Sequence, residues 1–402
     1  MNDDSRHVLL ALNVGSSSLK FAVYNANVQA WSAPQCLGSG SVCGQGQSER
    51  LVFACAGSQI QQQEQWSRGE ALQDHGTVRQ LMDWIERQVG WNICAVVHRV
   101  VHGGNRSQVA ARVDTALIDE MQALTPMAPL HQPLCLAPIK YLAGEHRDVP
   151  QFACFDTAFH HTLAWRDTCF GLPRALTEQG LRRYGFHGLS YEYIASVLPH
   201  YDSAAANGRT IVAHLGNGAS LCALDKSVSR ATTMGFSTLD GLLMGTRPGR
   251  LDPGIVLYLQ RERGMSASSV EHLLYHECGL LGVCGGISSD MRVLLDSQAP
   301  EAKEAIGLFV HCVVREIGAL AAVLGGVDAL VFTGGIGEHA AQVRQAILDG
   351  CQWLGVQPSR DEVNPRRGCL SAPGSAVSAW TIPTDENLVM ARHALRLLNP
   401  PT

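Results

Sequence analysis

Apolar and polar positions follow a clear pattern near the start of the chain, in the stretch VLLALNVGSSSLKFAVYN from Val8 to Asn25. One apolar run ends at Asn13, the polar turn Gly15 to Ser18 follows, and a second run begins at Leu19. Such a pattern predicts two strands joined by a tight turn. A chain reversal needs little more than a glycine. The serines and Lys20 therefore indicate that this turn has a further role.

Other segments have the periodicity of strands and amphipathic helices. Gly76 to Val89 has helical spacing, whereas Ile93 to Val101 and Gln151 to Asp156 are short apolar runs that predict strands. The polar region from Cys36 to Gly76, with its glutamine-rich part at Gln59 to Gln65, predicts surface strands and loops and suggests no function. Further helices are expected after the proline-punctuated segment Met127 to Pro138, and at Ser266 to His276, Ala299 to Leu324 and Ala340 to Leu348.

The opening pattern recurs about halfway along the chain. Thr210 to Leu224 reads TIVAHLGNGASLCAL, again an apolar strand, a polar residue, a glycine-rich turn and an apolar strand. His214 takes the place of Asn13, and Gly216 takes that of Gly15. The repeat suggests two similar domains that face one another, with two unrelated hairpins as the alternative.

The composition is that of a globular protein, with 46% hydrophobic and 17% charged residues. A length of 402 residues suggests two domains or one large α/β unit. A formal net charge of −5 without any basic block argues against nonspecific nucleic-acid binding, although it leaves room for a local cationic cleft. The N-terminus lacks the pattern of a signal peptide, and no apolar stretch is expected to reach membrane-spanning length. Thirteen cysteines without a C-x-x-C pair favour a reduced cytoplasm.

Glycine-rich turns between strands can present backbone N–H groups to an anion. Two lie in the repeated hairpins. A third, VFTGGIGE from Val331 to Glu338, runs from a strand into a helix, where missing side chains and the helix N-terminus suit a nucleotide. The common motifs G-x-x-x-x-G-K-[ST] and G-x-G-x-x-G after a strand are absent, so any nucleotide is expected in a different architecture.

Charged residues adjoin these turns. The guanidinium groups of Arg99 and Arg247 match the paired oxygens of carboxylate and phosphate. Acids at strand ends, such as Asp156 and Glu386, are suited to hold Mg²⁺ against phosphates. Taken singly, each of these residues is explained more simply as an ion-pair partner or a helix cap, and His187 as a buried structural histidine.

His98 and His102 lie four residues apart in HRVVH, the spacing of a metal-binding pair on a helix. The flanking valines favour a strand, which makes a metal site there the less favoured alternative.

Together these motifs resemble the acetokinase family of the actin/Hsp70/sugar-kinase superfamily. The similarity extends from about Val8 to Leu395 and includes NVGSSSLKF, HRVVHGG, APLH, FDTAFH, RRYGFHG, HLGNGAS, MGTRPGRLDPG, GISSDMR, TGGIGE and IPTDENL. It implies an α/β fold of two duplicated ribonuclease H-like domains with an interdomain active-site cleft. Residues 1–157, joined by a C-terminal helix at about 388–402, are the expected N-terminal domain, and residues 158–387 the C-terminal domain with the nucleotide site.

The resemblance implies a reversible, Mg²⁺-dependent transfer of the ATP γ-phosphoryl group to acetate, giving acetyl phosphate and ADP, with Mn²⁺ as an alternative metal. It also implies a cytoplasmic homodimer without nucleic-acid or membrane partners. The implied catalytic residues are Asp156, Arg99, Arg247 and His187, and the metal site is Asn13 with Glu386. The implied substrate contacts are Arg99, Val101, Leu130, Phe186 and Thr238, and the nucleotide contacts are Lys20, His214, Gly216, Asn217, Gly218, Asp290, Met291, Arg292, Gly335, Ile336 and Gly337.

Several positions depart from the usual family pattern. Tyr191 stands where histidine is usual, and Met291 replaces a phenylalanine, which puts the nucleotide preference in question. Thr238 replaces a proline near the acyl pocket. Because one methylene in an apolar slot changes binding by only about 1–3 kcal/mol, propionate or butyrate remains an alternative substrate.

A non-catalytic nucleotide-binding protein is the alternative from a different class, and it would leave Arg99 and Arg247 without a task. We expect instead that Arg99→Ala and Arg247→Ala each lower kcat severely while the fold survives.

Overall fold

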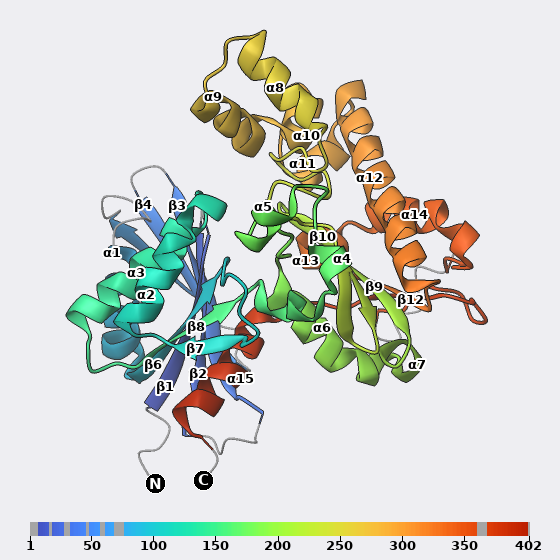
Figure 1. Ribbon diagram of the computed structural model, residues 1–402. Coiled ribbons are helices and arrows are strands. Elements are labelled where there is room, and N and C mark those ends of the chain that lie inside the picture. The colour runs from blue at the N-terminus through green and yellow to red at the C-terminus, as the bar shows by residue number, and fades with distance from the viewer. Residues whose placement is uncertain are drawn as a thin grey trace. The chain divides into compact units, whose positions relative to one another are not determined.

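The computed structural model describes residues 7–15, 18–27, 33–45, 48–56, 61–67, 76–359 and 368–400. It divides into two compact units (Figure 1): unit 1 comprises residues 1–159 and 385–402, and unit 2 comprises residues 160–384. Glu386, expected in the C-terminal domain, belongs to unit 1 because the chain returns there at Asp385. Ser16 and Ser17 of the polar turn lie outside the described residues, as do positions 46–47, 57–60 and 68–75 of the polar region.

Unit 1 is built on an eight-stranded sheet with the order β5-β4-β3-β2-β1-β6-β8-β7. β1 pairs antiparallel with β2 and parallel with β6, so the predicted opening hairpin is confirmed. The described part of the polar region forms three antiparallel strands that extend the sheet beyond β2. The strands are β1 (His7–Val14), β2 (Ser18–Asn25), β3 (Cys36–Gln45), β4 (Ser48–Cys55), β5 (Gln61–Ser67), β6 (Asn92–Val100), β7 (Ala110–Arg112) and β8 (Gln151–Phe155).

Helices cover both faces of this sheet. Successive side chains of β1 point to opposite faces, and both sets are buried. Val8, Leu10 and Leu12 join the core cluster that includes Leu142 of α3 (Gln132–Glu145), while Leu9 is buried on the opposite face. Figure 1 shows α15 (Glu386–Leu398) on the other side of the sheet from α3, and it packs against β1, β6 and β7. The remaining helical segments are α1 (Gly76–Trp84), the π-helical turn η2 (Ile85–Val89), α2 (Thr115–Ala123) and η3 (Thr125–Met127).

Unit 2 has a five-stranded sheet with the order β11-β10-β9-β12-β13. Its first two pairings are antiparallel and its last two are parallel, which is the pattern of β3-β2-β1-β6-β8 in unit 1. The shared order confirms the duplicated α/β architecture predicted from the repeated hairpin. The strands are β9 (Arg209–Leu215), β10 (Ala219–Asp225), β11 (Val228–Thr232), β12 (Ala329–Thr333) and β13 (Ser378–Thr381).

The helices expected at 266–276, 299–324 and 340–348 are confirmed within unit 2. Its helical segments are α4 (Trp165–Thr168), α5 (Arg174–Glu178), α6 (Gly188–Tyr201), α7 (Ser203–Ala206), α8 (Pro253–Arg261), α9 (Ala267–His272), η5 (Leu273–Glu277), α10 (Gly279–Val283), α11 (Met291–Asp296), α12 (Pro300–Leu324), α13 (Gly334–His339), α14 (Ala341–Gly350) and η6 (Gln352–Leu354). One further turn, η4 (Ala158–Thr162), lies where the chain passes from unit 1 to unit 2.

The helix α12 corrects one expectation. It has 25 residues, and an 18-residue window within it has a mean hydropathy of 1.8, so by length and composition it is able to cross a membrane and the expectation that no apolar stretch reaches that length is wrong. Its buried residues, among them Ala305, Phe309, Val313 and Ile317, recur every four positions along one face. That face packs against β10, β11 and α14. These are the contacts of a core helix, and a single such helix is weak evidence for a membrane span.

Candidate active site

Arg99 is the centre of a polar cluster in unit 1. It lies near the carboxyl end of β6, and Asp156 directly follows the neighbouring parallel strand β8, so both side chains lie at the same edge of the sheet. Arg99 Nη2 donates to Asp156 Oδ2 at 2.6 Å, and Arg99 Nε lies 3.1 Å from Oδ2 and 3.2 Å from Oδ1. The Asp156 side chain is only 1% exposed. The pair is therefore a buried, forked, charge-assisted interaction.

Two further predicted residues complete this cluster. Arg99 Nη1 donates to Asn13 Oδ1 at 3.3 Å and lies 3.5 Å from Glu386 Oε2. Asn13 Nδ2 donates to the same Glu386 oxygen at 3.1 Å. Lys20 is exposed and pairs directly with Asn13 across the hairpin, so the two side chains lie on one face. The fold thus gathers residues from four distant segments of the chain.

The charges of this cluster are balanced within unit 1. Burial opposes the positive charge of Arg99, but the carboxylates of Asp156 and Glu386 outweigh it and raise the pKa of Arg99. Cys135 on α3 borders the pair and gave no signal in the sequence. Burial raises the pKa of the Cys135 thiol to about 11, although Val101 and Arg99 act in the opposite direction, so the thiol is protonated at neutral pH.

A second polar cluster in unit 2 is built from α6 and the β9–β10 hairpin. His187 precedes α6 and has left-handed backbone angles, φ 59° and ψ 24°. Its Nδ1 lies 2.8 Å from Ser220 Oγ on β10, while His214 Nδ1 on β9 lies 2.8 Å from Ser190 Oγ on α6. The two imidazole rings stack with their centroids 4.2 Å apart. Two of the predicted residues are thereby held side by side, by serines that the sequence analysis missed.

The glycine-rich turn of this hairpin adjoins two predicted catalytic groups. A Cβ atom on Gly218 would lie 2.7 Å from Arg247 Nη2 and 3.5 Å from His187 Nε2. The missing side chain therefore lets both donors lie against the turn. The carbonyl of Asn217 accepts from the backbone N–H of Gly245 at 2.9 Å, which fixes the turn against the segment that carries Arg247.

Arg247 differs from Arg99 in its surroundings. Its Nη1 donates to the carbonyl oxygen of Thr238 at 2.8 Å, and no carboxylate of the described residues lies within ion-pair distance. Burial lowers the pKa of Arg247 to about 10, opposed by Tyr275, so the group still carries its charge at neutral pH. A desolvated cation without an anionic partner is suited to bind a carboxylate or phosphate.

Tyr275 is a residue of this cluster that the sequence analysis missed. Burial raises the pKa of its phenol, which Ser237 and Thr238 act to lower to a smaller extent, and its carbonyl oxygen accepts from Thr246 Oγ1 at 2.7 Å. It lies in the π-helical turn η5, a conformation that is often found at functional sites. A single tyrosine in an apolar stretch carries no signal by itself, and only the fold brings it near Arg247.

The expected adenosine segment is organised around Asp290. Asp290 Oδ1 accepts from the backbone N–H of Arg292 at 2.9 Å and so caps α11, and Arg292 Nη2 donates to Asp290 Oδ2 at 2.6 Å. Met291, the expected contact to the base, is 2% exposed, so its thioether packs inside unit 2. Met291 and Leu294 lie three residues apart in α11 and are both buried, so they share the face of the helix that packs against the core.

The expected phosphate site at the N-terminus of α13 is also modified by the structure. The backbone N–H of Gly334 donates to Glu338 Oε1 at 3.0 Å, and the N–H of Thr384 donates to the same oxygen at 3.2 Å. A carboxylate of the same segment therefore occupies the position foreseen for a phosphate. Gly335 is exposed, Ile336 is half-buried and Gly337 is buried.

The expected acyl contacts are divided between the two units. Val101, which is buried, and Leu130, which is half-buried, belong to unit 1. Phe186 and Thr238 belong to unit 2, and both are buried.

His98 lies within β6, as the flanking valines predicted. Its Nε2 lies 2.9 Å from Gln151 Oε1, and burial lowers the pKa of both His98 and His102 to about 4. Within the described ranges, no group of three or more histidine, cysteine, aspartate or glutamate residues is arranged to hold a metal. These histidines are structural, neutral groups at physiological pH.

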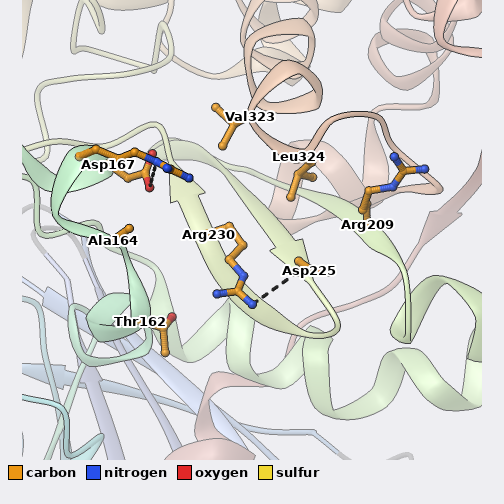
Figure 2. A pocket seen from close by; sticks show the side chains of 9 residues that line it. Thr162, Ala164, Asp167, Arg209, Asp225, Arg230, Val323 and Leu324 are labelled. Carbon is orange, nitrogen blue, oxygen red and sulfur yellow. Dashed lines mark hydrogen bonds and ion pairs between the residues drawn. The ribbon is translucent and has the colours of Figure 1, made fainter.

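Figure 2 shows a cavity of about 330 Å³ elsewhere in unit 2, lined by Thr162, Ala164, Arg166, Asp167, Arg209, Asp225, Arg230, Val323 and Leu324. None of the predicted site residues lines it. Arg209 pairs with Asp328 at 2.7 Å, Arg230 with Asp225 at 3.4 Å, and Arg166 lies 3.7 Å from Asp167. Because each arginine has an acidic partner, this cavity offers no excess charge to a ligand.

Comparison with known proteins agrees with this geometry. The chain matches the model of the Acetokinase family over residues 8–392. It is 50% identical over 394 residues to the acetate kinase of Rhodopseudomonas palustris (strain ATCC BAA-98 / CGA009), and the aligned region covers 97% of this chain and 98% of that protein. Among solved structures it is similar to a propionate kinase from Francisella tularensis subsp. tularensis SCHU S4, with a TM-score of 0.86, 32% identity and coverage of 96% and 98%. It is also similar to Porphyromonas gingivalis acetate kinase, with a TM-score of 0.83, 28% identity and coverage of 98% and 100%. The chain therefore belongs to the acetokinase family.

Proposed function

We propose that the protein acts as an acetate kinase, which transfers the γ-phosphoryl group of ATP to acetate and gives acetyl phosphate and ADP in a reversible reaction. The observation that carries this proposal is the cationic cluster of unit 2. There Arg247 and His187 adjoin the Gly218 turn, and no described carboxylate neutralises Arg247. The 50% identity to an acetate kinase supports acetate as the acceptor.

The chemistry of phosphoryl transfer explains why the site needs hydrogen-bond donors that are not neutralised by carboxylates. Phosphoryl transfer spreads negative charge over the equatorial oxygens of the transferring group, and fixed donors lower the barrier by stabilising that charge. Acetate is already an anion and needs no general base, but the triphosphate repels it. In this proposal Arg247 and His187 donate to the transferring phosphoryl group, and the Gly216–Gly218 turn with His214 binds the adjacent phosphates.

Arg99 has a complementary role in this proposal. Its Nη1 group binds the acetate carboxylate, while the buried Asp156 orients the guanidinium through its bonds to Nε and Nη2. The proposed apolar contacts to the methyl group are Val101, Leu130, Phe186 and Thr238.

Mg²⁺ is the proposed metal, with Mn²⁺ as the alternative. Asn13 and Glu386 supply oxygen atoms of the kind that Mg²⁺ prefers, and their side chains are joined by a 3.1 Å hydrogen bond. A site with one carboxylate fits, because Mg²⁺ in such enzymes is completed by water and by substrate phosphates. When bound, the metal would neutralise part of the phosphate charge.

The proposed contacts to the adenosine group come from the segment around Asp290 and from α13. Arg292, with 85% of its side chain exposed, and Asp290 are placed to meet the adenosine group, together with Gly335, Ile336 and Gly337. Lys20 is the proposed partner of a phosphate. Met291, which is buried, is proposed to support this segment from beneath.

Propionate is the second candidate acceptor. Two observations favour keeping it: Thr238 replaces the proline usual in the family, and the structurally similar Francisella protein is described as a propionate kinase. A methylene changes binding by only about 1–3 kcal/mol, so the two acids are separated by measurement of kcat/KM for acetate, propionate and butyrate.

We also propose a homodimer in a reduced cytoplasm. The helix α8 buries none of its residues, and Ile255, Leu257 and Tyr258 are 45%, 49% and 50% exposed. Contiguous exposed apolar residues mark association surfaces, and the family resemblance suggests a second copy as the partner. All thirteen cysteines are free thiols, which suits a reducing compartment.

A hydroxamate assay for acyl phosphate tests the proposed function. The purified protein with ATP, Mg²⁺ and acetate should produce acetyl hydroxamate after addition of hydroxylamine, and Arg247→Ala should not. An absence of acyl phosphate from acetate, propionate and butyrate alike would sink the proposal and favour a non-catalytic nucleotide-binding protein.

A further inference from the structure

The two stacked histidines of unit 2 are held in a reciprocal way. Helix α6 contributes His187 and Ser190, and the β9–β10 hairpin contributes Ser220 and His214, which are direct cross-strand partners. Each histidine uses Nδ1 to contact the serine of the other element, at 2.8 Å in both cases. Since Nδ1 is engaged, the opposite ring atom Nε2 is the one that each histidine presents to the glycine turn, where His187 Nε2 approaches Gly218.

The backbone conformation of His187 shows that the surrounding structure holds its imidazole ring in this orientation. A non-glycine residue in the left-handed region costs roughly 1–2 kcal/mol and persists only where neighbouring structure holds it. Here the carbonyl of His187 accepts from the backbone N–H of Tyr191 at 3.1 Å, which starts the hydrogen bonding of α6. The ring is held by Ser220 and stacks on His214.

Tyr191 extends this arrangement by one more group. Its side chain is completely buried, and its hydroxyl oxygen lies 2.5 Å from Ser220 Oγ. Ser220 is buried as well, so the three polar groups Tyr191, Ser220 and His187 form a chain inside unit 2 that ends at the glycine turn. Tyr191 lies four residues after His187, hence on the same face of α6.

We propose that Tyr191 is a positioning residue that selects, through Ser220, the tautomer of His187 with its proton on Nε2. The Tyr191 hydroxyl donates to Ser220 Oγ, and Ser220 donates its own proton to Nδ1 of His187. The neutral imidazole then carries its proton on Nε2, where it can donate to an anion beside Gly218. This role deepens the proposed phosphoryl transfer and rests on it for its catalytic part.

The reason for a second donor lies in the chemistry of serine. A hydroxyl can donate to Nδ1 or accept from an Nδ1 proton, so Ser220 alone does not choose between the two tautomers. The wrong tautomer would direct the Nε2 lone pair towards the substrate oxygens. A donor behind Ser220 occupies its acceptor site and biases its proton towards His187. The tyrosine found here in place of the histidine usual in the family supplies such a donor.

The experiment is nitrogen NMR of the protein labelled with ¹⁵N-histidine, without nucleotide and at neutral pH. His187→Gln identifies the His187 signals by their loss. In the wild type, Nδ1 of His187 should have the shift of an unprotonated nitrogen and Nε2 that of a protonated one. In Tyr191→Phe, which removes only the hydroxyl, the two shifts should move towards each other as the tautomers mix. Tyr193→Phe, the same change on the same helix, should leave them unchanged.

Kinetics of the same variants supplies the second readout. Tyr191→Phe should lower kcat about tenfold while the KM values for ATP and acetate change less than about twofold, because the affected interaction belongs to the transferring group. Ser220→Ala, which removes the middle of the chain, should change tautomer and kcat at least as much and covers the case in which Tyr191→Phe does not fold.

A wild-type His187 with its proton on Nδ1, or unchanged shifts in a folded Tyr191→Phe, would overturn the proposal, and so would unchanged shifts in Ser220→Ala if Tyr191→Phe does not fold. Because the NMR measurement requires no turnover, it can fail while acetyl phosphate is still formed, and it can succeed if the proposed function is wrong.

Discussion

Arg99 in unit 1 and Arg247 in unit 2 are both largely desolvated arginines at the edges of related sheets, yet their electrostatic surroundings are opposite. Arg99 faces two carboxylates, and its pKa is raised although burial acts against it. Arg247 meets a carbonyl oxygen and a glycine turn, and burial lowers its pKa to about 10. The two guanidinium groups are therefore the same in chemistry and different in the charge that surrounds them.

The difference shows how one duplicated architecture serves two purposes. In unit 1 the charge is balanced internally, so the cluster can orient a substrate without attracting anions strongly by itself. In unit 2 the charge is left unbalanced, which costs stability and provides a binding site for an anion. We expect the substitutions below to separate these two cases.

The largest expected effect is on kcat, and it should follow substitution of either arginine. Arg247→Ala should lower kcat by about 10³-fold, the scale found for arginines that stabilise a transferring phosphoryl group. Arg99→Ala should lower kcat by about 10³-fold as well, because acetate would no longer be oriented for attack. Initial rates of acyl phosphate formation at saturating ATP and acetate measure this. A near-normal kcat in either variant would remove that arginine from the site.

Stability should distinguish the two variants. Arg99→Ala leaves Asp156 buried without its partner, which should lower the free energy of unfolding by about 3–5 kcal/mol. Arg247→Met removes a buried charge that has no acidic partner, so it should leave stability equal or higher. The sequence led us to expect that the fold survives both changes, and the structure adds that Arg99→Ala should be the less stable of the two.

Urea denaturation of the two variants, with Asp156→Asn beside Arg99→Ala as a matched control, measures the difference. Equal losses in Arg99→Ala and Arg247→Met would contradict the contrast between the units.

A smaller effect is expected from the turn that holds Arg247. In Gly218→Ala the new Cβ would come within 2.7 Å of Arg247 Nη2, so the guanidinium must move. A displacement of this kind should lower kcat by roughly 10- to 100-fold. Gly307→Ala is the matched control, because a Cβ there meets no atom within 4 Å, and it should keep full activity. Full activity in Gly218→Ala would show that the turn does not fix Arg247.

The smallest expected effect is a loss of stability at acidic pH, and it should be similar in the two units. Burial lowers the pKa of His98 in unit 1 and of His160 in unit 2 to about 4, below the ordinary value of roughly 6.5. Between these values the unfolded chain binds protons that the folded units do not. Stability therefore falls as the pH decreases from about 6.5 to 4, by at most about 1.4 kcal/mol per pH unit for each histidine.

His98→Gln should flatten this dependence in urea titrations over the same pH range, whereas the exposed His200→Gln should not. An unchanged slope in His98→Gln would show that this histidine is protonated in the folded state.

The elements of the fold were largely accessible from the sequence. The apolar runs around Asn13 and His214 predicted both hairpins, because a short apolar run bounded by turn residues is a local property of the sequence. The sequence also predicted that a C-terminal helix, at about 388–402, joins the first domain, and α15 with unit 1 begins only two or three residues earlier, at Glu386 and Asp385.

The candidate site was accessible only in part. Motifs identified the charged residues, but not that Asp156 neutralises Arg99 while Arg247 has no such partner among the described residues. Ser220, Tyr191 and Tyr275 carry no sequence signal of their own, since their roles depend on which side chains the folded chain places within 3 Å. The burial of Met291 could not be predicted for the same reason, because burial is a property of the whole unit.

The most direct test of the contrast is a calorimetric titration of acetyl phosphate into protein freed of metal and nucleotide. The wild type and Arg99→Ala should bind it with affinities within about threefold of each other, because Arg99 is already neutralised. Arg247→Ala should lose binding. Retained binding in Arg247→Ala together with its loss in Arg99→Ala would contradict the account.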